Sequence, residues 1–501
     1  MNKLTYSSTR SHEATLSFSQ AVVKGIAPDG GLYVPSFFPE IDILDASLQT
    51  LSYQDLAKKI LAMYLVDFTE DEIANCVDSA YDSKFENSEI APIKTLDHAS
   101  FIELYHGKTL AFKDMALSIL PYLMKTGAEK IGLQEEIVIL TATSGDTGKA
   151  ALEGFADVPG TRIIVFYPTD GVSEIQKRQM TTQEGSNVTV LGIAGNFDDA
   201  QNGVKSIFLD DALKSELLKK GYVFSSANSI NIGRLLPQIV YYIHAYLALV
   251  REGTIVNGDL INVAVPTGNF GNILAAYYAK SMGLPIKTFI CASNVNHVLT
   301  DFINTGVYDI NRPFEITNSP SMDILISSNL ERFLYAISGG NTEVLSDLMR
   351  GLKAKGKYAI NDIMRAKMAD FTGGYATDDE AMETIKFLFD TFEYVVDTHT
   401  AVAYKVYQDY VTVTGDKTQT LIASTASPFK FSESVAEGLG LSESDIDNKS
   451  ELGAFEWIEK LAQAANLKVP APIQWLESKP ILHTRTIEKD ALKEAILEVL
   501  K

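Results

Sequence analysis

Short apolar runs that alternate with helical patterns constrain the fold of this chain more than any other feature. Four such runs fall between residues 96 and 200, and a second set begins near residue 258. Each run is nearly continuous, as is typical of strands that helices cover on both faces, and the spacing fits crossover helices. The expected strands are Phe101–Tyr105, Ile137–Ala142, Arg162–Tyr167, Asn187–Ile193, Leu260–Pro266, Ile286–Ala292, Tyr394–Val396 and Gln419–Ala423.

This pattern predicts an α/β fold with two open, mostly parallel sheets, helices on both faces of each sheet, and an N-terminal appendage. At 501 residues the chain is too long for one core. We expect an appendage over 1–95, a smaller α/β unit over 96–225, a larger one over 226–440, and a C-terminal helical segment over 441–501. Further helices are expected at Tyr53–Leu65, Glu70–Tyr81, Leu235–Val250 and Ile487–Leu500.

The charge and the cysteines exclude several classes of function. A formal net charge of −21 argues against nucleic acids and anionic membranes as partners. Cys76 and Cys291 are too far apart for a metal-ligand spacing, so we expect neither a disulfide scaffold nor a metal site. The apolar run Leu235–Val250 is shorter than the ~20 residues of a spanning helix. With no signal-peptide pattern at its start, the chain is expected to be cytoplasmic.

Ligands of open parallel sheets bind at the carboxyl ends of the strands, so the loops there are the candidate site. Lys113 lies between the strand Phe101–Tyr105 and a helical pattern that starts near Ala116. Beside Phe112, in an apolar pocket, this lysine would lose its proton easily and could attack a carbonyl, including a pyridoxal aldehyde. The alternative is a solvated lysine at a helix start.

Two loops suit anions. Thr143–Gly148 is a polar turn at a helix start and is suited to a carboxylate; it lacks the residues of a Walker A loop. Gly268–Asn272 follows another strand, and its two glycines let the backbone approach a phosphate at the next helix start. It lacks the G-x-G-x-x-G pattern of a dinucleotide site. Ordinary strand–helix connections remain the alternative.

Two further clusters carry polar side chains. Asn228, Ser229 and Arg234 offer short hydrogen-bonding groups and a guanidinium fork for phosphate or carboxylate. The alternative there is a helix cap with a solvated arginine. The stretch Ser424–Lys430 lies at another strand end, where its hydroxyls could meet a ring nitrogen or form a turn.

Several motifs resemble those of a single enzyme family, and they are spread from residue 6 to about residue 431. The chain resembles the threonine synthases of the longer bacterial and fungal kind. These are fold-type II pyridoxal-phosphate enzymes, with a fold like that of tryptophan synthase β. It departs from the family pattern at Ser427, where the family has histidine, and at Thr398, where it has proline. The matching stretches are Tyr6–Arg10, Asp29–Pro35, Thr109–Asp114, Thr143–Gly148, Gly268–Asn272, Ser321–Arg332 and Asp397–Ala403.

The resemblance implies that Lys113 anchors pyridoxal 5′-phosphate and then serves as base and acid. The implied substrate is O-phospho-L-homoserine, which is converted with water to L-threonine and phosphate by a monomer or homodimer. Thr425 is implied as the partner of the pyridine nitrogen, with Ser424 as the alternative, and Lys108 as a helper at the substrate phosphate. The implied cofactor-binding residues are Lys113, Gly268, Asn269, Phe270, Gly271, Asn272 and Thr425. The implied substrate-binding residues are Ser144, Asp146 and Thr147 at the carboxylate, with Asn228, Ser229 and Arg234 at the phosphate.

Three alternatives to this function stay open. A serine or threonine dehydratase would share the cofactor loops, but it has no substrate phosphate for Arg234 to hold. A pyridoxal-phosphate-dependent phospho-lyase would release phosphate without adding water. A silent homologue that only binds a ligand is the third, and the retained Lys113 and anion loops speak against it.

Overall fold

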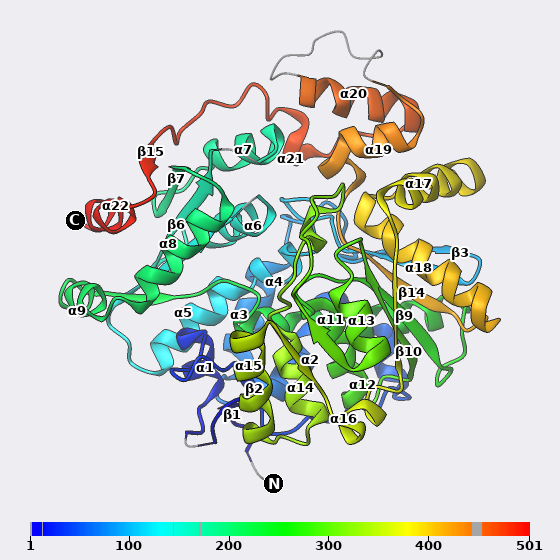
Figure 1. Cartoon of the computed structure of the whole chain (residues 1–501), viewed down its shortest axis with the longest axis horizontal. Coiled ribbons are helices and arrows are strands. Elements are labelled where there is room, and N and C mark those ends of the chain that lie inside the picture. Colours follow the sequence, from blue (N-terminus) through cyan, green and yellow to red (C-terminus); the bar gives the residue numbers. More distant parts are fainter. Residues whose placement is uncertain (1–2, 13, 144, 170–171, 443–452) are drawn as a thin grey trace.

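The computed structural model describes residues 3–12, 14–143, 145–169, 172–442 and 453–501. Figure 1 shows two sheets wrapped by helices, with the N-terminal segment packed below them and the C-terminal segment at the opposite side. One sheet has six strands in the order β13-β10-β9-β14-β4-β3, and the other has five in the order β15-β7-β6-β5-β8. Two small two-stranded sheets, β1-β2 and β11-β12, complete the pairing. The strands are β1 (Tyr6–Ser8), β2 (Tyr33–Pro35), β3 (Ile93–Leu96), β4 (Ala99–Glu103), β5 (Glu136–Ala142), β6 (Thr161–Pro168), β7 (Val188–Ala194), β8 (Tyr222–Ser225), β9 (Ile261–Pro266), β10 (Ile286–Ser293), β11 (Val307–Asp309), β12 (Lys357–Ala359), β13 (Phe371–Tyr375), β14 (Thr420–Ser424) and β15 (Thr486–Glu488).

Helices surround both sheets. The helices are α1 (Phe18–Lys24), η1 (Ala46–Thr50), α2 (Tyr53–Tyr64), α3 (Glu70–Ala80), α4 (Asp114–Leu117), α5 (Leu120–Lys130), α6 (Asp146–Phe155), α7 (Glu174–Thr181), α8 (Phe197–Leu209), α9 (Asp211–Lys219), α10 (Ile232–Leu235), α11 (Pro237–Arg251), α12 (Gly271–Met282), α13 (Val298–Thr305), η2 (Pro320–Met322), α14 (Leu330–Ile337), α15 (Thr342–Lys355), α16 (Asp362–Ala366), α17 (Asp378–Phe392), α18 (Thr398–Thr414), η3 (Pro428–Phe431), α19 (Ser432–Gly438), α20 (Gly453–Ala465), α21 (Ala471–Gln474) and α22 (Leu492–Val499). In the part of the chain that the structure describes, no helix is both long and apolar enough to cross a membrane.

The central strands β9 and β14 of the six-stranded sheet are buried on both faces, and this explains their continuous hydrophobic runs. Val263 and Val265 of β9 belong to the large core that includes α11 and α12. Ala264, between them, faces the other way and packs in a second core with Ala401 and Val402 of α18. Because side chains alternate along a strand, helices on both sides require apolar residues at every position. The predicted α/β fold with two mostly parallel sheets is confirmed. Within the described strands of these two sheets, only β3 pairs antiparallel, with β4.

One strand predicted for this sheet is present and another is absent. The strand predicted at Phe101–Tyr105 is β4, which pairs with β14, a strand far away in the sequence. Tyr394–Val396 is not a strand, and β13 holds the edge position instead. The glycines of β13 hid it from hydrophobic patterning, yet they are needed: a Cβ at Gly373 would lie 2.8 Å from Cα of Thr300, and one at Gly374 would lie 2.6 Å from Val406. The close packing of α13 and α18 therefore depends on them.

The C-terminal segment joins the two halves of the molecule. α19 and α20 pack beside α17, and the chain then passes over α7, where Arg178 donates to the backbone carbonyls of Leu476 and Lys479. It ends as β15, parallel to β7, and α22, which packs on α8. The helix predicted at Ile487–Leu500 therefore begins only at Leu492. The domain boundaries stay a prediction.

The N-terminal appendage forms the predicted helices α2 and α3, and the predicted buried helix is α11. Thr69 and Glu72 form a capping box at the start of α3. The fully buried Arg332 ties the appendage to the site. It donates from Nε to the carbonyl of Tyr33 at 2.9 Å and from a second nitrogen to the carbonyl of Ile230.

Candidate active site

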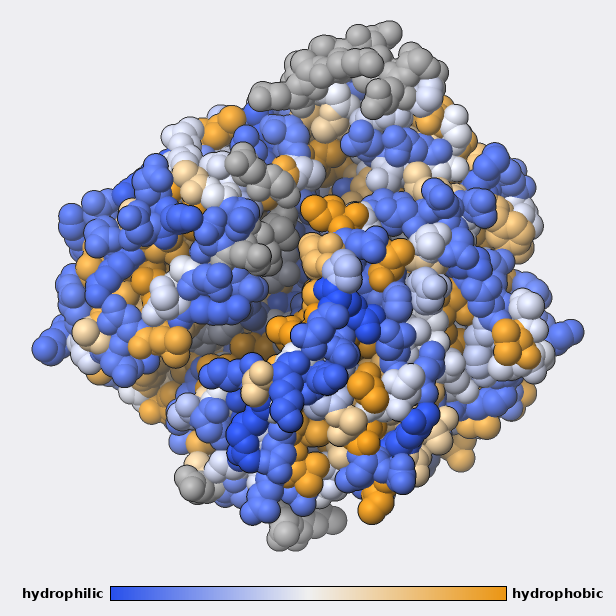
Figure 2. Space-filling model, viewed as in Figure 1, coloured by the Kyte–Doolittle hydropathy of each residue, from blue (hydrophilic) through white to orange (hydrophobic). Residues whose placement is uncertain are grey.

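Three neighbouring strands of the six-stranded sheet, β9, β14 and β4, end at one edge and carry the three predicted cofactor elements. The chain after β4 folds back onto the end of β14. Leu104 donates its backbone N–H to the carbonyl of Ser424 at 3.0 Å, and Phe112 donates to that of Thr425 at 2.8 Å. This places Lys113 beside the end of β14. Figure 2 shows the surface hollowed between the half of the molecule with the five-stranded sheet and the half with the six-stranded sheet.

Lys113 is buried, so the alternative of a solvated lysine was wrong. Its side chain is 12% exposed, and its Nζ lies 3.2 Å from Oδ2 of Asp146, 3.3 Å from Oγ of Ser321 and 5.3 Å from the centre of the Phe112 ring. Burial lowers the pKa of Lys113 below its ordinary value, against the pull of Asp146 in the other direction. The charge of Arg234 also lowers it. A neutral amine is therefore more accessible here than at a surface lysine.

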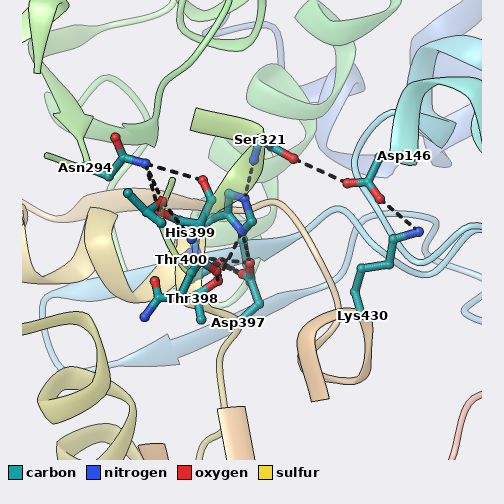
Figure 3. Close-up of polar contacts among 12 residues, drawn as sticks. Asp146, Asn294, Ser321, Asp397, Thr398, His399, Thr400 and Lys430 are labelled. Atoms are coloured by element: carbon teal, nitrogen blue, oxygen red, sulfur yellow. Dashed lines mark hydrogen bonds and ion pairs between the residues drawn. The ribbon is translucent and has the colours of Figure 1, made fainter. Parts of the chain in front are cut away.

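Asp146, the first residue of α6, brings the two sheets' loops together. Its carboxylate accepts from Ser321 at 3.3 Å and lies 3.1 Å from Nζ of Lys430 (Figure 3). It also accepts from Gln176 at 2.8 Å and lies 3.2 Å from Nζ of Lys113. Burial alone would raise the pKa of this carboxyl, but Lys430 and Lys113 hold it well below its usual range. Asp146 is therefore a fixed anion of the site.

The predicted carboxylate loop is only partly described. Ser144 lies outside the described residues, and Thr147 is half-buried in the first turn of α6. The side chain of Thr143 accepts from the backbone N–H groups of Gly145 and Gly148, which shapes the turn. Because the Asp146 carboxylate already binds cations, its contribution to a substrate carboxylate would come through backbone N–H groups at the helix start. Substrate binding by these residues stays a prediction.

The loop Gly268–Asn272 fits a phosphate. Phe270 adopts a left-handed conformation with φ of 60°, and α12 begins directly after it. A Cβ at Gly268 would lie 2.6 Å from the carbonyl oxygen of Ser321, so only glycine allows this approach. The Nδ2 groups of Asn272 and Asn329 are both buried without a partner among the described residues. Unsatisfied buried donors are costly, and a bound phosphate would satisfy them.

Asn329 was not predicted as part of this loop. A Cβ at Gly271 would lie 3.5 Å from its Nδ2, and its Oδ1 accepts from Arg332. Asn269 meets the same segment, since its carbonyl oxygen accepts from the backbone N–H of Asn329 at 3.1 Å. The segment around Asn329 therefore closes the phosphate loop from one side.

Arg234 is also buried, so the alternative of a solvated arginine was wrong. One guanidinium nitrogen donates to the carbonyl of Ala227 at 2.8 Å, while Nε has no partner among the residues described. Burial lowers its pKa to about 10. Asn228 and Ser229 are half-buried on the loop before α10. Asn231 caps α10, as the helix-cap interpretation predicted for this stretch.

The structure distinguishes Ser424 from Thr425. The hydroxyl of Ser424 lies 3.2 Å from that of Thr400, which in turn donates to Asp397. The hydroxyl of Thr425, in contrast, has no hydrogen-bond partner in the described part of the chain, although the residue is 5% exposed. A free hydroxyl at the end of β14 is available to a ring nitrogen, which favours Thr425.

Three residues of this site were missed by sequence reasoning: Lys430, Gln176 and Ser321. Lys430 lies between Phe429 and Phe431 at a strand end, the same signal that singled out Lys113. Ser321 lies at the start of a stretch that resembles the family, but no role was inferred for it. Gln176 had no local signal, because a long segment separates it from the loop that it meets. The remaining lysine of the prediction, Lys108, is 51% exposed at its side chain and lies 3.7 Å from Glu153.

His399 supports the site from behind. Its Nε2 accepts from the backbone N–H of Ser321 at 3.1 Å, so Nδ1 carries the proton that it donates to Asp397 at 2.7 Å. Thr398, one of the two family departures, donates its hydroxyl to the carbonyl of Asn318 at 2.7 Å. Ser427, the other departure, caps η3 by accepting from the backbone N–H of Phe429. Both departures therefore serve local structure.

Two known protein families match separate parts of the chain. The family described as "Threonine synthase N terminus" matches residues 5–81, and the one described as "Pyridoxal-phosphate dependent enzyme" matches residues 102–424. A threonine synthase of Schizosaccharomyces pombe is 36% identical over 467 residues, which cover 87% of this chain and 89% of that protein.

A solved structure described as PLP-bound threonine synthase from Brucella melitensis has a TM-score of 0.88 at 33% identity and covers 100% of both chains. The human protein named "Threonine synthase-like 1" is 40% identical over 464 residues, or 89% of this chain. This chain spans 62% of the length of that human protein.

Proposed function

Because the chain belongs to the threonine synthase family, we propose that it converts O-phospho-L-homoserine and water to L-threonine and phosphate. It depends on pyridoxal 5′-phosphate. One observation carries the proposal: Lys113 lies near two separate groups of residues that each suit an anion. The loop Gly268–Asn272 suits the cofactor phosphate, and Arg234 suits a substrate phosphate. An enzyme with a phosphorylated cofactor and a phosphorylated substrate needs both.

Bound pyridoxal phosphate supplies an electron sink that makes the protons on Cα and Cβ of an amino acid acidic. Lys113 then receives such a proton at Nζ and returns it, first as base and then as acid. Its burial favours the neutral amine that this role requires. Asp146 and Ser321 hold Nζ in position, at 3.2 and 3.3 Å.

Different sets of charged and polar groups bind the two ends of the substrate. Arg234, with Asn228 and Ser229, binds the phosphate and stabilises the negative charge that grows as it leaves. The first turn of α6, with Ser144 and Thr147, binds the carboxylate through backbone N–H groups and hydroxyls. Thr425 donates or accepts a hydrogen bond at the pyridine nitrogen without adding charge, which restrains the electron sink.

A product assay tests the proposal. Purified full-length protein with O-phospho-L-homoserine should release phosphate and L-threonine in equal amounts. Phosphate without threonine would support a pyridoxal-phosphate-dependent phospho-lyase instead. Turnover of serine or threonine, without turnover of the phosphorylated substrate, would support a dehydratase.

We also propose a cytoplasmic enzyme that acts as a monomer or homodimer on small molecules. The net charge of −21 supports the absence of nucleic acid and membrane partners. Cys76 and Cys291 are both buried free thiols, which suits a reducing compartment. Sedimentation of the purified holoenzyme distinguishes the monomer from the dimer.

A further inference from the structure

Lys430 is a second lysine of the site, and its Nζ is buried among three oxygen atoms. Its side chain is 1% exposed. Nζ lies 2.9 Å from the carbonyl oxygen of Thr109, 3.2 Å from Oε1 of Gln179 and 3.1 Å from Oδ1 of Asp146. Two of these contacts are hydrogen bonds, to Thr109 and Gln179, and the third is an ion pair with Asp146. Three oxygen atoms around Nζ suit an ammonium group, which has three N–H donors.

Lys113 shares the same carboxylate but is bound less completely. It approaches Oδ2 of Asp146 at 3.2 Å and Ser321 at 3.3 Å. Lys430 approaches the other carboxylate oxygen, Oδ1 (Figure 3). One anion thus faces two lysines. If both were charged, this buried group would carry a net positive charge, which is costly at low dielectric. If Lys113 is neutral, the negative charge of Asp146 and a positive charge on Lys430 cancel.

We propose that Lys430 is a positioning residue: it neutralises Asp146 and so leaves Lys113 free to lose its proton. The inference rests on the proposed role of Lys113 as cofactor anchor and base. The lowered pKa of Lys113, to which burial and the charge of Lys430 both contribute, agrees with this arrangement. Lys430 acts through Asp146.

Among the residues that the structure describes, the other charged groups around Lys113 do not provide a second anion. Arg234, on α10, adds positive charge. Asp114, the next residue of the chain, is turned toward Thr109. Its carboxylate accepts hydrogen bonds from the backbone N–H and the hydroxyl of Thr109. His399, on α18, binds Asp397 and reaches Lys113 only through Ser321. Asp146 is therefore the anion that sets the charge balance at Lys113.

The experiment measures the titration of Lys113 in the full-length chain freed of cofactor. Limiting acetic anhydride is added across a pH series, and peptide mass spectrometry gives the labelled fraction of Lys113 relative to the exposed Lys355. The parent is compared with Lys430→Met, Lys430→Arg, Asp146→Asn and the double variant Lys430→Met with Asp146→Asn. Circular dichroism confirms that each variant is folded.

Removal of Lys430 should make Lys113 the sole counterion of Asp146. We expect the half-labelling pH of Lys113 to rise by about one unit or more in Lys430→Met, a roughly tenfold loss of neutral amine at a fixed pH. Lys430→Arg, which keeps the charge, should stay near the parent. Asp146→Asn should shift the half-labelling pH the other way, and the double variant should return toward the parent because both charges are gone.

Two results would overturn the inference. One is a parent-like titration of Lys113 in Lys430→Met. The other is a double variant whose half-labelling pH for Lys113 equals that of Lys430→Met, which would show that Lys430 has a structural role only. The titration of Lys113 is measured without substrate and does not depend on the product assay. If the predicted shifts occur but the enzyme makes no threonine, the proposed function is contradicted and this inference still holds.

Discussion

The backbone N–H of Phe112 donates to the carbonyl oxygen of Thr425 at 2.8 Å. This bond holds Lys113, one residue further on, against the end of β14, and the adjacent bridge between Ala111 and Ala426 strengthens the contact. Lys113, the proposed cofactor anchor, and Thr425, the proposed partner of the pyridine nitrogen, are therefore positioned by one piece of backbone.

Replacement of Thr425 by valine tests the hydroxyl at the ring nitrogen. Valine has a similar shape but cannot form the hydrogen bond, so cofactor affinity should fall about three- to tenfold, as for loss of one neutral bond. The absorbance band of the bound cofactor should shift as well. Ser424→Ala is the control, since its hydroxyl meets Thr400. A larger effect of Ser424→Ala than of Thr425→Val would reassign the partner.

Replacement of Asn329 by aspartate tests the unpaired donor at the phosphate loop. The change keeps the oxygen that accepts from Arg332 but places a negative charge beside Gly271. Affinity for pyridoxal 5′-phosphate should fall about tenfold or more, because a charged hydrogen bond is lost and repulsion is added. Equilibrium binding of unphosphorylated pyridoxal is the control. Equal losses for both ligands would contradict a role at the phosphate.

Replacement of Arg234 by glutamine tests the substrate phosphate site. Loss of a buried guanidinium partner should lower kcat/KM for O-phospho-L-homoserine roughly a hundredfold or more. The cofactor absorbance should be unchanged, since Arg234 is assigned to the substrate and not to the cofactor. Inorganic phosphate should also lose potency as an inhibitor. If the cofactor is lost instead, Arg234 belongs to the cofactor site.

The pH dependence of stability tests Asp114. Burial raises its pKa from 3.8 to about 6, while the bonds from Thr109 act in the opposite direction. The folded state therefore holds this proton more tightly than the unfolded chain. The stabilisation is complete below about pH 4 and is lost as the pH rises through about 6, which costs about 3 kcal/mol at neutral pH.

Asp114→Asn removes this titration. Urea unfolding at about pH 4 and about pH 7 should show the variant gaining about 3 kcal/mol relative to the parent between the two conditions. A pH-independent difference in unfolding free energy would show that Asp114 is ionised throughout.

Sequence patterns predicted the fold class and the loops of the site, because both follow from local rules. Continuous apolar strands require two covering layers, and ligand loops lie at the carboxyl ends of such strands. Lys113 and Gly268–Asn272 were found in this way. The pairing of β4 with β14 could not be predicted, since strand order is set by long-range packing and not by the order in the chain.

The cluster around Asp146 likewise could not be predicted from local sequence patterns. Gln176, Ser321 and Lys430 come from three separate segments, and only the folded structure brings them to one carboxylate. Asp146 was predicted to meet the substrate, and this stays a prediction. Its side chain contacts Lys113 and Lys430.

The most direct test of the account is to reduce the holoenzyme with borohydride and locate the cofactor by peptide mass. Lys113 and Lys430 both contact the carboxylate of Asp146, so the position of the adduct shows which of the two lysines binds the cofactor. We predict a single pyridoxyl adduct on the peptide that contains Lys113, and its loss in Lys113→Ala. An adduct on the peptide of Lys430, or no adduct on Lys113, would contradict the assignment on which the account depends.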